Sequence, residues 1–180
     1  MTLKKITVLG KEFTELISGG DIEKRIGELA CEINRDYNGK DVIFLGILNG
    51  AFLFAAGLFK KISLDARISF VKLTSYEGTK SSGSIKELIG WNEDIRGKDV
   101  IIIEDIVDTG ATLERIIDEV GIRKAATVKV ATLLFKPDAY KKTIPVDYVG
   151  FRIPNDFVIG YGLDYEGYAR NLPSIYKMVE

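Results

Sequence analysis

The chain has 180 residues, of which 46% are hydrophobic, and its 25 Lys and Arg nearly balance its 26 Asp and Glu. This size and composition predict one well-buried domain spanning residues 1–180. The formal charge of −1 provides no general attraction to nucleic acid or to an anionic membrane, so we expect neither as a partner.

Two residue counts exclude whole classes of chemistry. The chain has no histidine, which excludes Ser-His-Asp and Cys-His catalysis. Its one cysteine, Cys31, excludes an internal disulfide and a structural zinc site, and we expect it to be a small buried residue of a helix. The N-terminus lacks the apolar core of a signal peptide, and no run approaches the roughly 18 apolar residues of a membrane span. We therefore expect a cytoplasmic protein.

The hydrophobic pattern of the first half of the chain predicts a helix, a strand and a second helix, in that order. Helical spacing predicts an amphipathic helix over residues 21–37, with apolar side chains at Ile22, Ile26, Leu29, Ala30 and Ile33. The near-continuous apolar run 41–48 predicts a buried strand, and residues 51–59 predict a helix after it.

Three further segments predict strands. Residues 67–74 alternate partly, which favours a strand nearer the edge of the sheet, and residues 126–134 and 146–151 form further strands. Strands that alternate with helices predict a parallel α/β sheet. Residues 75–90, rich in Gly, Ser and Lys, predict a mobile excursion. An exposed hairpin without function is the alternative, but the length and placement of this segment favour a lid.

The stretch VIIIEDIVDTGAT, residues 100–112, is the most informative in the chain. Residues 100–103 predict a buried parallel strand, with Glu104, Asp105 and Asp108 at its carboxyl end, where α/β sheets bind ligands. The turn residues that follow and the helical spacing of 113–120 predict a helix that starts near Ala111.

A helix start of this kind suits a phosphate monoester, because its backbone N–H groups are free and Gly110 allows close approach. Thr109 and Thr112 add hydroxyl groups. The acids fit a sugar phosphate whose ribose hydroxyls donate to Glu104 and Asp105 and whose other phosphates arrive with Mg²⁺. An ordinary acidic turn is the alternative. Neither GxxxxGK[ST] nor GxGxxG occurs in the chain.

Residues 100–112 resemble the phosphoribosyl diphosphate (PRPP) motif of the type I phosphoribosyltransferases. The resemblance implies their α/β fold: a parallel-sheet core flanked by helices, with a small hood made from the N-terminal and C-terminal segments. It also implies that one run of residues binds the ribose and the 5′-phosphate, namely Glu104, Asp105, Asp108, Thr109, Gly110, Ala111 and Thr112.

Further segments resemble the hypoxanthine-guanine branch of this family. The resemblance implies that Lys136 donates to the exocyclic oxygen of a purine, that Phe157 stacks on the ring and that the Val158 backbone reads its edge. Asp164 matches a carboxylate of this purine segment that holds a Mg²⁺ carrying the pyrophosphate, which gives Glu104, Asp105 and Asp164 as expected metal ligands. The expected pyrophosphate contacts are Asn49, Gly50, Ser75, Tyr76 and Arg170.

The chain departs from the family pattern at two positions. Many relatives have lysine where this chain has Asn49, in a turn that carries a non-proline cis peptide, and some have lysine in place of Ala111. Both changes remove a cation near the phosphates, so we expect PRPP affinity to depend more on Mg²⁺ and Arg170.

The resemblance implies an enzyme that joins a 6-oxopurine to PRPP and releases pyrophosphate, with Asp108 as the proton acceptor at purine N7, and a homodimer or homotetramer. A regulator that senses PRPP or a nucleotide and binds RNA is an alternative, which the slightly acidic charge disfavours. An orotate or uracil transferase is a second alternative, which Lys136 and Phe157 argue against.

Overall fold

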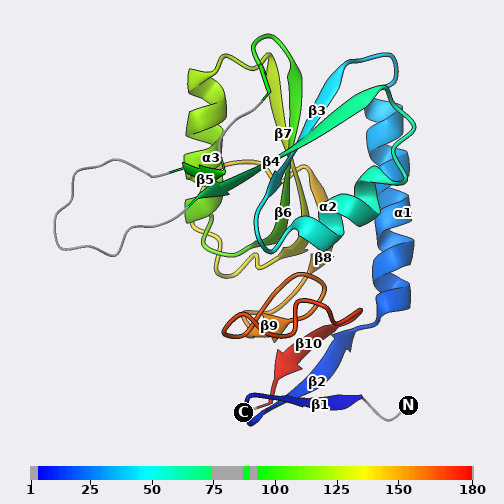
Figure 1. Cartoon of the computed structure of the whole chain (residues 1–180), viewed down its shortest axis with the longest axis vertical. Helices are drawn as coiled ribbons and strands as arrows, with labels where there is room; N and C mark the ends of the chain where they lie inside the picture. Colours follow the sequence, from blue (N-terminus) through cyan, green and yellow to red (C-terminus); the bar gives the residue numbers. More distant parts are fainter. Residues whose placement is uncertain (1–3, 74–86, 90–92, 180) are drawn as a thin grey trace, which may run out of the picture.

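The computed structural model describes residues 4–73, 87–89 and 93–179. The predicted lid over residues 75–90, with Ser75 and Tyr76, lies outside the described residues except for β5 (Glu87–Ile89), so its role stays a prediction. The described chain forms a larger sheet with helices beside it and a smaller sheet at one end (Figure 1).

The larger sheet has six strands within the described residues, in the order β5-β4-β3-β6-β7-β8. Five of them run parallel, and β5 pairs antiparallel with β4 at the edge. This confirms the predicted parallel α/β sheet, and it places residues 67–73 of the strand predicted over 67–74 next to the edge strand. The parallel strands are β3 (Val42–Ile47), β4 (Ala66–Leu73), β6 (Asp99–Val107), β7 (Thr127–Phe135) and β8 (Tyr148–Arg152).

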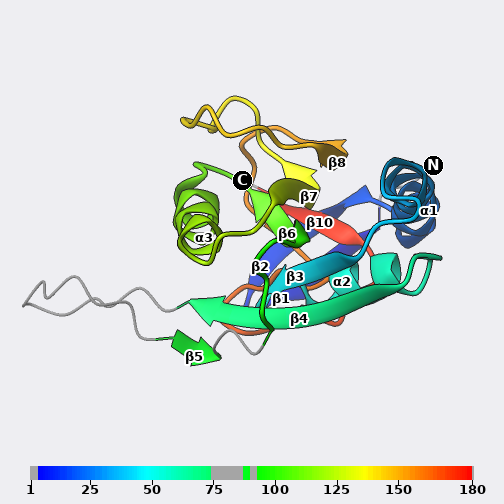
Figure 2. The ribbon, with the colours of Figure 1, turned by 90° about the horizontal axis from the view of Figure 1, so that it is seen from above.

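Helices cover both faces of this sheet (Figure 2). Helices α1 (Gly19–Asp36) and α2 (Phe52–Phe59) share one apolar core with Ile101 and Ile103 of β6. Helix α3 (Ala111–Ile122) packs on the opposite face, in a second core with Val100 and Ile102. Successive strand residues point to opposite faces, and both faces are covered, which explains why β3 and residues 100–103 of β6 are apolar without alternation.

Helix α1 follows its sequence pattern closely. Ser18 caps it, since the Ser18 hydroxyl accepts from the Asp21 amide at 3.1 Å, and the predicted apolar stripe is buried. The expectation for Cys31 is wrong, because this side chain is exposed. Residue 31 is turned by about 100° from Ala30, which places it beyond the edge of the buried stripe.

The smaller sheet joins the two terminal segments of the described chain. Its antiparallel strands lie in the order β1-β2-β10-β9, and Phe13, Ile159 and Tyr176 form its core. Among the described residues, no helix has the length and apolar character needed to cross a membrane. The strands of the smaller sheet are β1 (Lys5–Val8), β2 (Lys11–Ile17), β9 (Val158–Ile159) and β10 (Ile175–Met178).

Candidate active site

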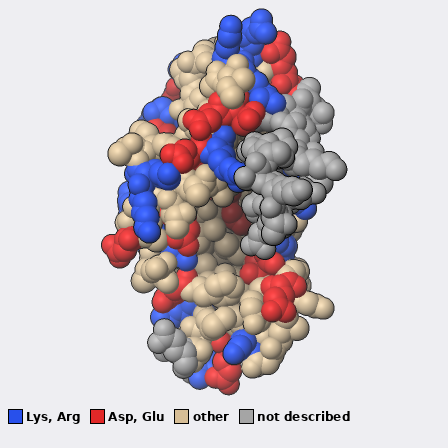
Figure 3. Space-filling view, turned by 90° about the vertical axis from the view of Figure 1, so that its left-hand side faces the viewer, with Lys and Arg blue, Asp and Glu red and all other residues tan. Residues whose placement is uncertain are grey.

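A cavity of about 360 Å³ opens at the carboxyl ends of β3 and β6. Seen from the side, the surface is hollowed between the larger and the smaller sheet, and acidic atoms lie inside the hollow (Figure 3). Because β3, β6 and β7 are neighbours and run parallel, the turns that follow them meet at this one edge of the sheet. The cavity is lined by Ile47, Leu48, Gly50 and the continuous run from Glu104 to Leu113.

The turn after β6 leads directly into α3, which starts at Ala111 as predicted. Gly110 is the N-cap residue with φ +84°, a left-handed conformation that favours glycine, and its Cα packs against the Tyr140 ring. Thr109, Ala111 and Thr112 are exposed. Since Gly110 has no side chain to cap the helix, the first amides of α3 are open to an anionic ligand.

Glu104 and Asp105 lie inside β6, whereas the sequence analysis predicted a strand over residues 100–103 with both acids at its end. The strand continues to Val107 because its pairing with β7 continues to Phe135. Glu104 is only 5% exposed, and burial, followed by the neighbouring Asp105 carboxylate, raises its pKa well above the usual range. Burial also raises the pKa of Asp105, although the Ile106 amide donates to this carboxylate at 2.8 Å.

The turn after β3 is confined from two sides. Its Leu48–Asn49 peptide is cis, as the family resemblance predicted, and Asn49 is exposed. A Cβ atom on Gly50 would overlap the Asp105 carboxylate, and a Cβ atom on Gly162 would overlap the Gly50 carbonyl oxygen. Glycine at both positions therefore lets the C-terminal loop (residues 160–174, between β9 and β10), the β3 turn and β6 pack directly together.

Lys136 and Asp108 form an ion pair in which Lys136 Nζ lies 2.9 Å from Asp108 Oδ2. The two residues follow adjacent strands, and the Lys136 amide also donates to the Val107 carbonyl at 3.0 Å. The Lys136 side chain is 9% exposed and that of Asp108 is 43% exposed. The pair thus joins a buried cation to an anion that solvent or a ligand can reach.

An exposed aromatic ring lies directly before β9, and an arginine lies in the C-terminal loop after it. Phe157 is 47% exposed, and Tyr165 supports it in a T-shaped contact with ring centroids 5.9 Å apart, while Val158 is buried in β9. Arg170 Nη2 lies 2.6 Å from Asp164 Oδ1, and Arg170 Nη1 donates to the Gly162 carbonyl at 2.6 Å. The arginine is therefore fixed beside the Gly50 turn.

The three expected metal ligands lie on two separate elements, and their role stays a prediction. Across residues 4–73, 87–89 and 93–179, no three acidic, His or Cys side chains gather as a metal site. Glu104 and Asp105 are neighbours on β6, whereas Asp164 pairs with Arg170 and accepts from the Gly167 amide at 2.6 Å. The donor set of Glu104 and Asp105 still fits Mg²⁺, which proteins bind through one or two carboxylates with substrate oxygens completing the shell.

Sequence reasoning missed three residues that shape the site, namely Tyr140, Gly162 and Tyr165. Tyr140 stands behind Gly110, and Tyr165 supports Phe157. Gly162 carried a signal, because it belongs to the run Gly160-Tyr161-Gly162, where paired glycines favour a tight turn. Nothing in the local sequence indicated the other two.

Comparisons with known proteins show the family to which the chain belongs. The phosphoribosyl transferase domain family matches residues 13–166. A hypoxanthine phosphoribosyltransferase of Salmonella typhimurium is 38% identical over 91% of this chain and 94% of its own length. A crystal structure of a hypoxanthine phosphoribosyltransferase from Staphylococcus aureus superposes with a TM-score of 0.85 at 40% identity, covering 92% of this chain and 90% of that one.

A bifunctional TilS/HprT protein of Listeria innocua is 44% identical over 89% of this chain, which spans only a quarter of that protein's length. The fold and the family match define the class of this protein as the type I phosphoribosyltransferase family. The chain belongs to this family, in its hypoxanthine-guanine phosphoribosyltransferase branch.

Proposed function

We propose that the chain transfers the phosphoribosyl group of PRPP to a 6-oxopurine and releases pyrophosphate, as in purine salvage. The observation that carries this proposal is the Lys136–Asp108 ion pair beside an uncapped helix start. A purine presents O6 and N7 on one edge, so an ammonium and a carboxylate 2.9 Å apart can meet adjacent atoms of that edge. The names of the relatives support an enzyme and give no support to an RNA-binding regulator.

PRPP would extend along the cavity from the turn after β6 to the turn after β3. Its 5′-phosphate would accept from the first amides of α3 and from the hydroxyls of Thr109 and Thr112. The ribose hydroxyls would donate to Glu104 and Asp105. The pyrophosphate would lie at Gly50 beside Arg170, whose guanidinium group suits a phosphate.

The reaction forms a bond between purine N9 and C1′ of the ribose and breaks the bond between C1′ and the pyrophosphate oxygen. The proton on N7 passes to Asp108, so the purine does not become cationic as its bond forms. Lys136 orients the base by donating to O6, and Phe157 stacks on the ring. When bound, Mg²⁺ would be held by Glu104 and Asp105 and would neutralise charge on the leaving pyrophosphate.

We also propose that the chain assembles as a homodimer or homotetramer. Phe52, at the start of α2, is 37% exposed although this helix is apolar on all sides, which suits burial against another copy. Sedimentation of the full chain would test this, and a monomer across the measured concentrations would contradict it.

The decisive experiment measures kcat/KM with PRPP, Mg²⁺ and a panel of bases. Hypoxanthine, guanine and xanthine accept at position 6, whereas adenine presents an amino group to the Lys136 ammonium, so two donors meet. Sites built around a polar pair reject such analogues by about 10⁴ to 10⁵. We therefore expect the unmodified chain to reject adenine. Lys136→Gln has an amide that can also accept, so it should reduce the ratio of kcat/KM for hypoxanthine to kcat/KM for adenine. Comparable use of adenine by the unmodified chain would contradict the proposal.

A further inference from the structure

Tyr161 holds an unusual position at the tip of a tight turn in the C-terminal loop. Gly160 and Leu163 close this turn with two backbone hydrogen bonds of 3.0 Å, and the residues at its tip have left-handed backbones. Gly162 has φ +104°, which costs glycine little, but Tyr161 has φ +46°, which is rare for a bulky side chain. Such a conformation persists only where surrounding contacts hold it.

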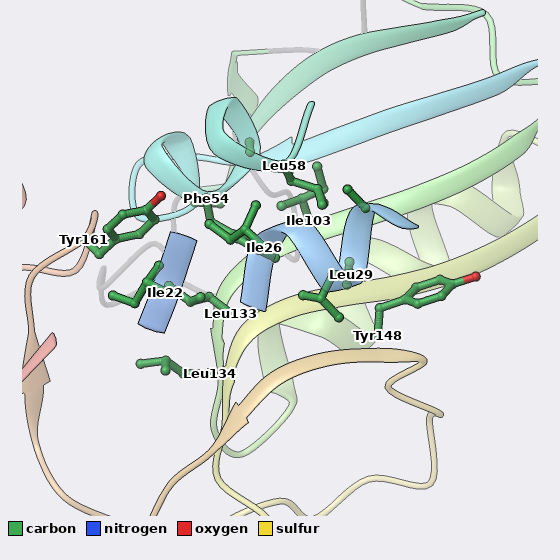
Figure 4. Packing of buried hydrophobic residues seen from close by; sticks show 14 of the residues in the cluster. Ile22, Ile26, Leu29, Phe54, Leu58, Ile103, Leu133, Leu134, Tyr148 and Tyr161 are labelled. Carbon is green, nitrogen blue, oxygen red and sulfur yellow. The ribbon is translucent and has the colours of Figure 1, made fainter. Parts of the chain in front are cut away.

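The contacts that hold Tyr161 come from α1 and α2. The residue is 8% exposed, and its ring joins the apolar core near Ile22 and Phe54, as Figure 4 shows. Its hydroxyl donates to Glu23 Oε1 on α1 at 3.0 Å. On α2, Gly57 leaves room for this hydroxyl, because a Cβ atom there would lie 3.0 Å from it.

The same turn packs on Gly50, which lines the end of the cavity where we propose that pyrophosphate binds. Gly162, the residue after Tyr161, packs its Cα on the Gly50 carbonyl, and its own carbonyl accepts from Arg170 at 2.6 Å. The Gly162 amide donates to the Arg170 carbonyl at 2.9 Å. A displacement of Tyr161 would therefore move Gly162 and Arg170 and would disturb the contact between Gly162 and Gly50.

We infer that Tyr161, held by Glu23, is a positioning residue that fixes the C-terminal loop against the Gly50 turn and thereby sets affinity for the pyrophosphate end of PRPP. This inference rests on the proposed function. The hydroxyl acts on the site through the loop, since Tyr161 is absent from the lining of the cavity. Glu23 is 55% exposed in its side chain and also lies 3.6 Å from Lys61, so losing the hydrogen bond leaves no buried charge. Removal of this hydrogen bond should therefore change the geometry of the loop more than it lowers the stability of the fold.

The chain offers a matched control in Tyr148. Its hydroxyl donates to Asp36 Oδ2 on the same helix at 3.0 Å, and it is 6% exposed. Tyr148 lies on β8, at the other end of α1 from Tyr161 (Figure 4), and does not line the cavity. Tyr148→Phe and Tyr161→Phe thus remove the same kind of bond, but only the second bond anchors the Gly50 contact.

The experiment uses the full chain and measures kcat, KM for PRPP, KM for hypoxanthine and the inhibition constant of inorganic pyrophosphate. For Tyr161→Phe we expect KM for PRPP and the pyrophosphate constant to rise about three- to tenfold, the effect of one lost hydrogen bond, with KM for hypoxanthine unchanged. Glu23→Ala should behave like Tyr161→Phe, and Glu23→Gln, which keeps an acceptor, should restore both constants. Tyr148→Phe should leave both unchanged at a similar loss of thermal stability.

Two results would overturn the inference while leaving the proposed function intact. One is that the unmodified chain is active but the inhibition constant of pyrophosphate is the same in Tyr161→Phe and Glu23→Ala as in the unmodified chain. The other is an equal change in Tyr148→Phe, which would indicate a general effect of stability. An unmodified chain that forms no nucleotide from PRPP and any base overturns the proposed function, and this inference with it. If Tyr161→Phe folds poorly, Glu23→Ala still tests the inference, because the Glu23 side chain is half-exposed and its removal should not disturb folding.

Discussion

Removing either partner of the Lys136–Asp108 ion pair should have unequal effects on stability, because the two side chains differ in exposure. Asp108→Ala strands an ammonium group on a side chain that is 9% exposed. An unpaired charge costs about 3 to 5 kcal/mol when fully buried. Because the Asp108 side chain is 43% exposed, water can fill its place in Asp108→Ala and solvate the ammonium group. We therefore expect the free energy of unfolding to fall by only about 2 kcal/mol. Lys136→Met keeps the buried stem and leaves a carboxylate that water solvates, so its effect should stay below about 1 kcal/mol.

Thermal and urea unfolding of the full chain without substrates would measure this difference. In a domain of this size, 1 kcal/mol corresponds to about 2 to 4 °C, so Asp108→Ala should lower Tm by about 4 to 8 °C. The double variant should recover most of that loss, because it removes the stranded charge. A larger loss for Lys136→Met than for Asp108→Ala, or a double variant that loses the sum of both, would refute the reasoning.

Three further predictions concern the chemistry of the site. Asp108→Asn should lower kcat by about 10² to 10⁴ while PRPP affinity, measured by calorimetry, stays close to normal; near-normal turnover would contradict the role of general base. Gly50→Ala forces a methyl group into the Asp105 carboxylate, so it should weaken PRPP binding and cost about 1 to 3 kcal/mol of stability; normal values of both would show that the turn is not confined. Burial raises the pKa of Glu104 and Asp105, and each must lose its proton to hold Mg²⁺, so Mg²⁺ affinity should rise with pH and fall as pH drops through these raised pKa values. A Kd for Mg²⁺ that does not vary with pH would be evidence against these ligands.

The sequence by itself determined the elements whose cause is local. The 3.6-residue period of α1 and the continuous apolar runs of β3 and β6 follow directly from burial on one helix face or on both sheet faces. The start of α3 was also predictable, because Gly110 can adopt the left-handed conformation that the turn requires. These features depend on neighbouring residues, so their signals are contained in short windows of the chain.

The tertiary structure alone decided which distant residues meet. Strand β2 pairs with β10, so Phe13 lies opposite Met178, and nothing local in these short, charged strands indicates that partner. Strand β6 continues through Glu104 and Asp105 only because β7 offers it pairing, and Lys136 reaches Asp108 only because these two strands are adjacent. Likewise, the confinement of Gly50 by Asp105 and Gly162 depends on contacts between separate elements. Strand order and register arise from long-range packing, which the periodicity of a sequence does not encode.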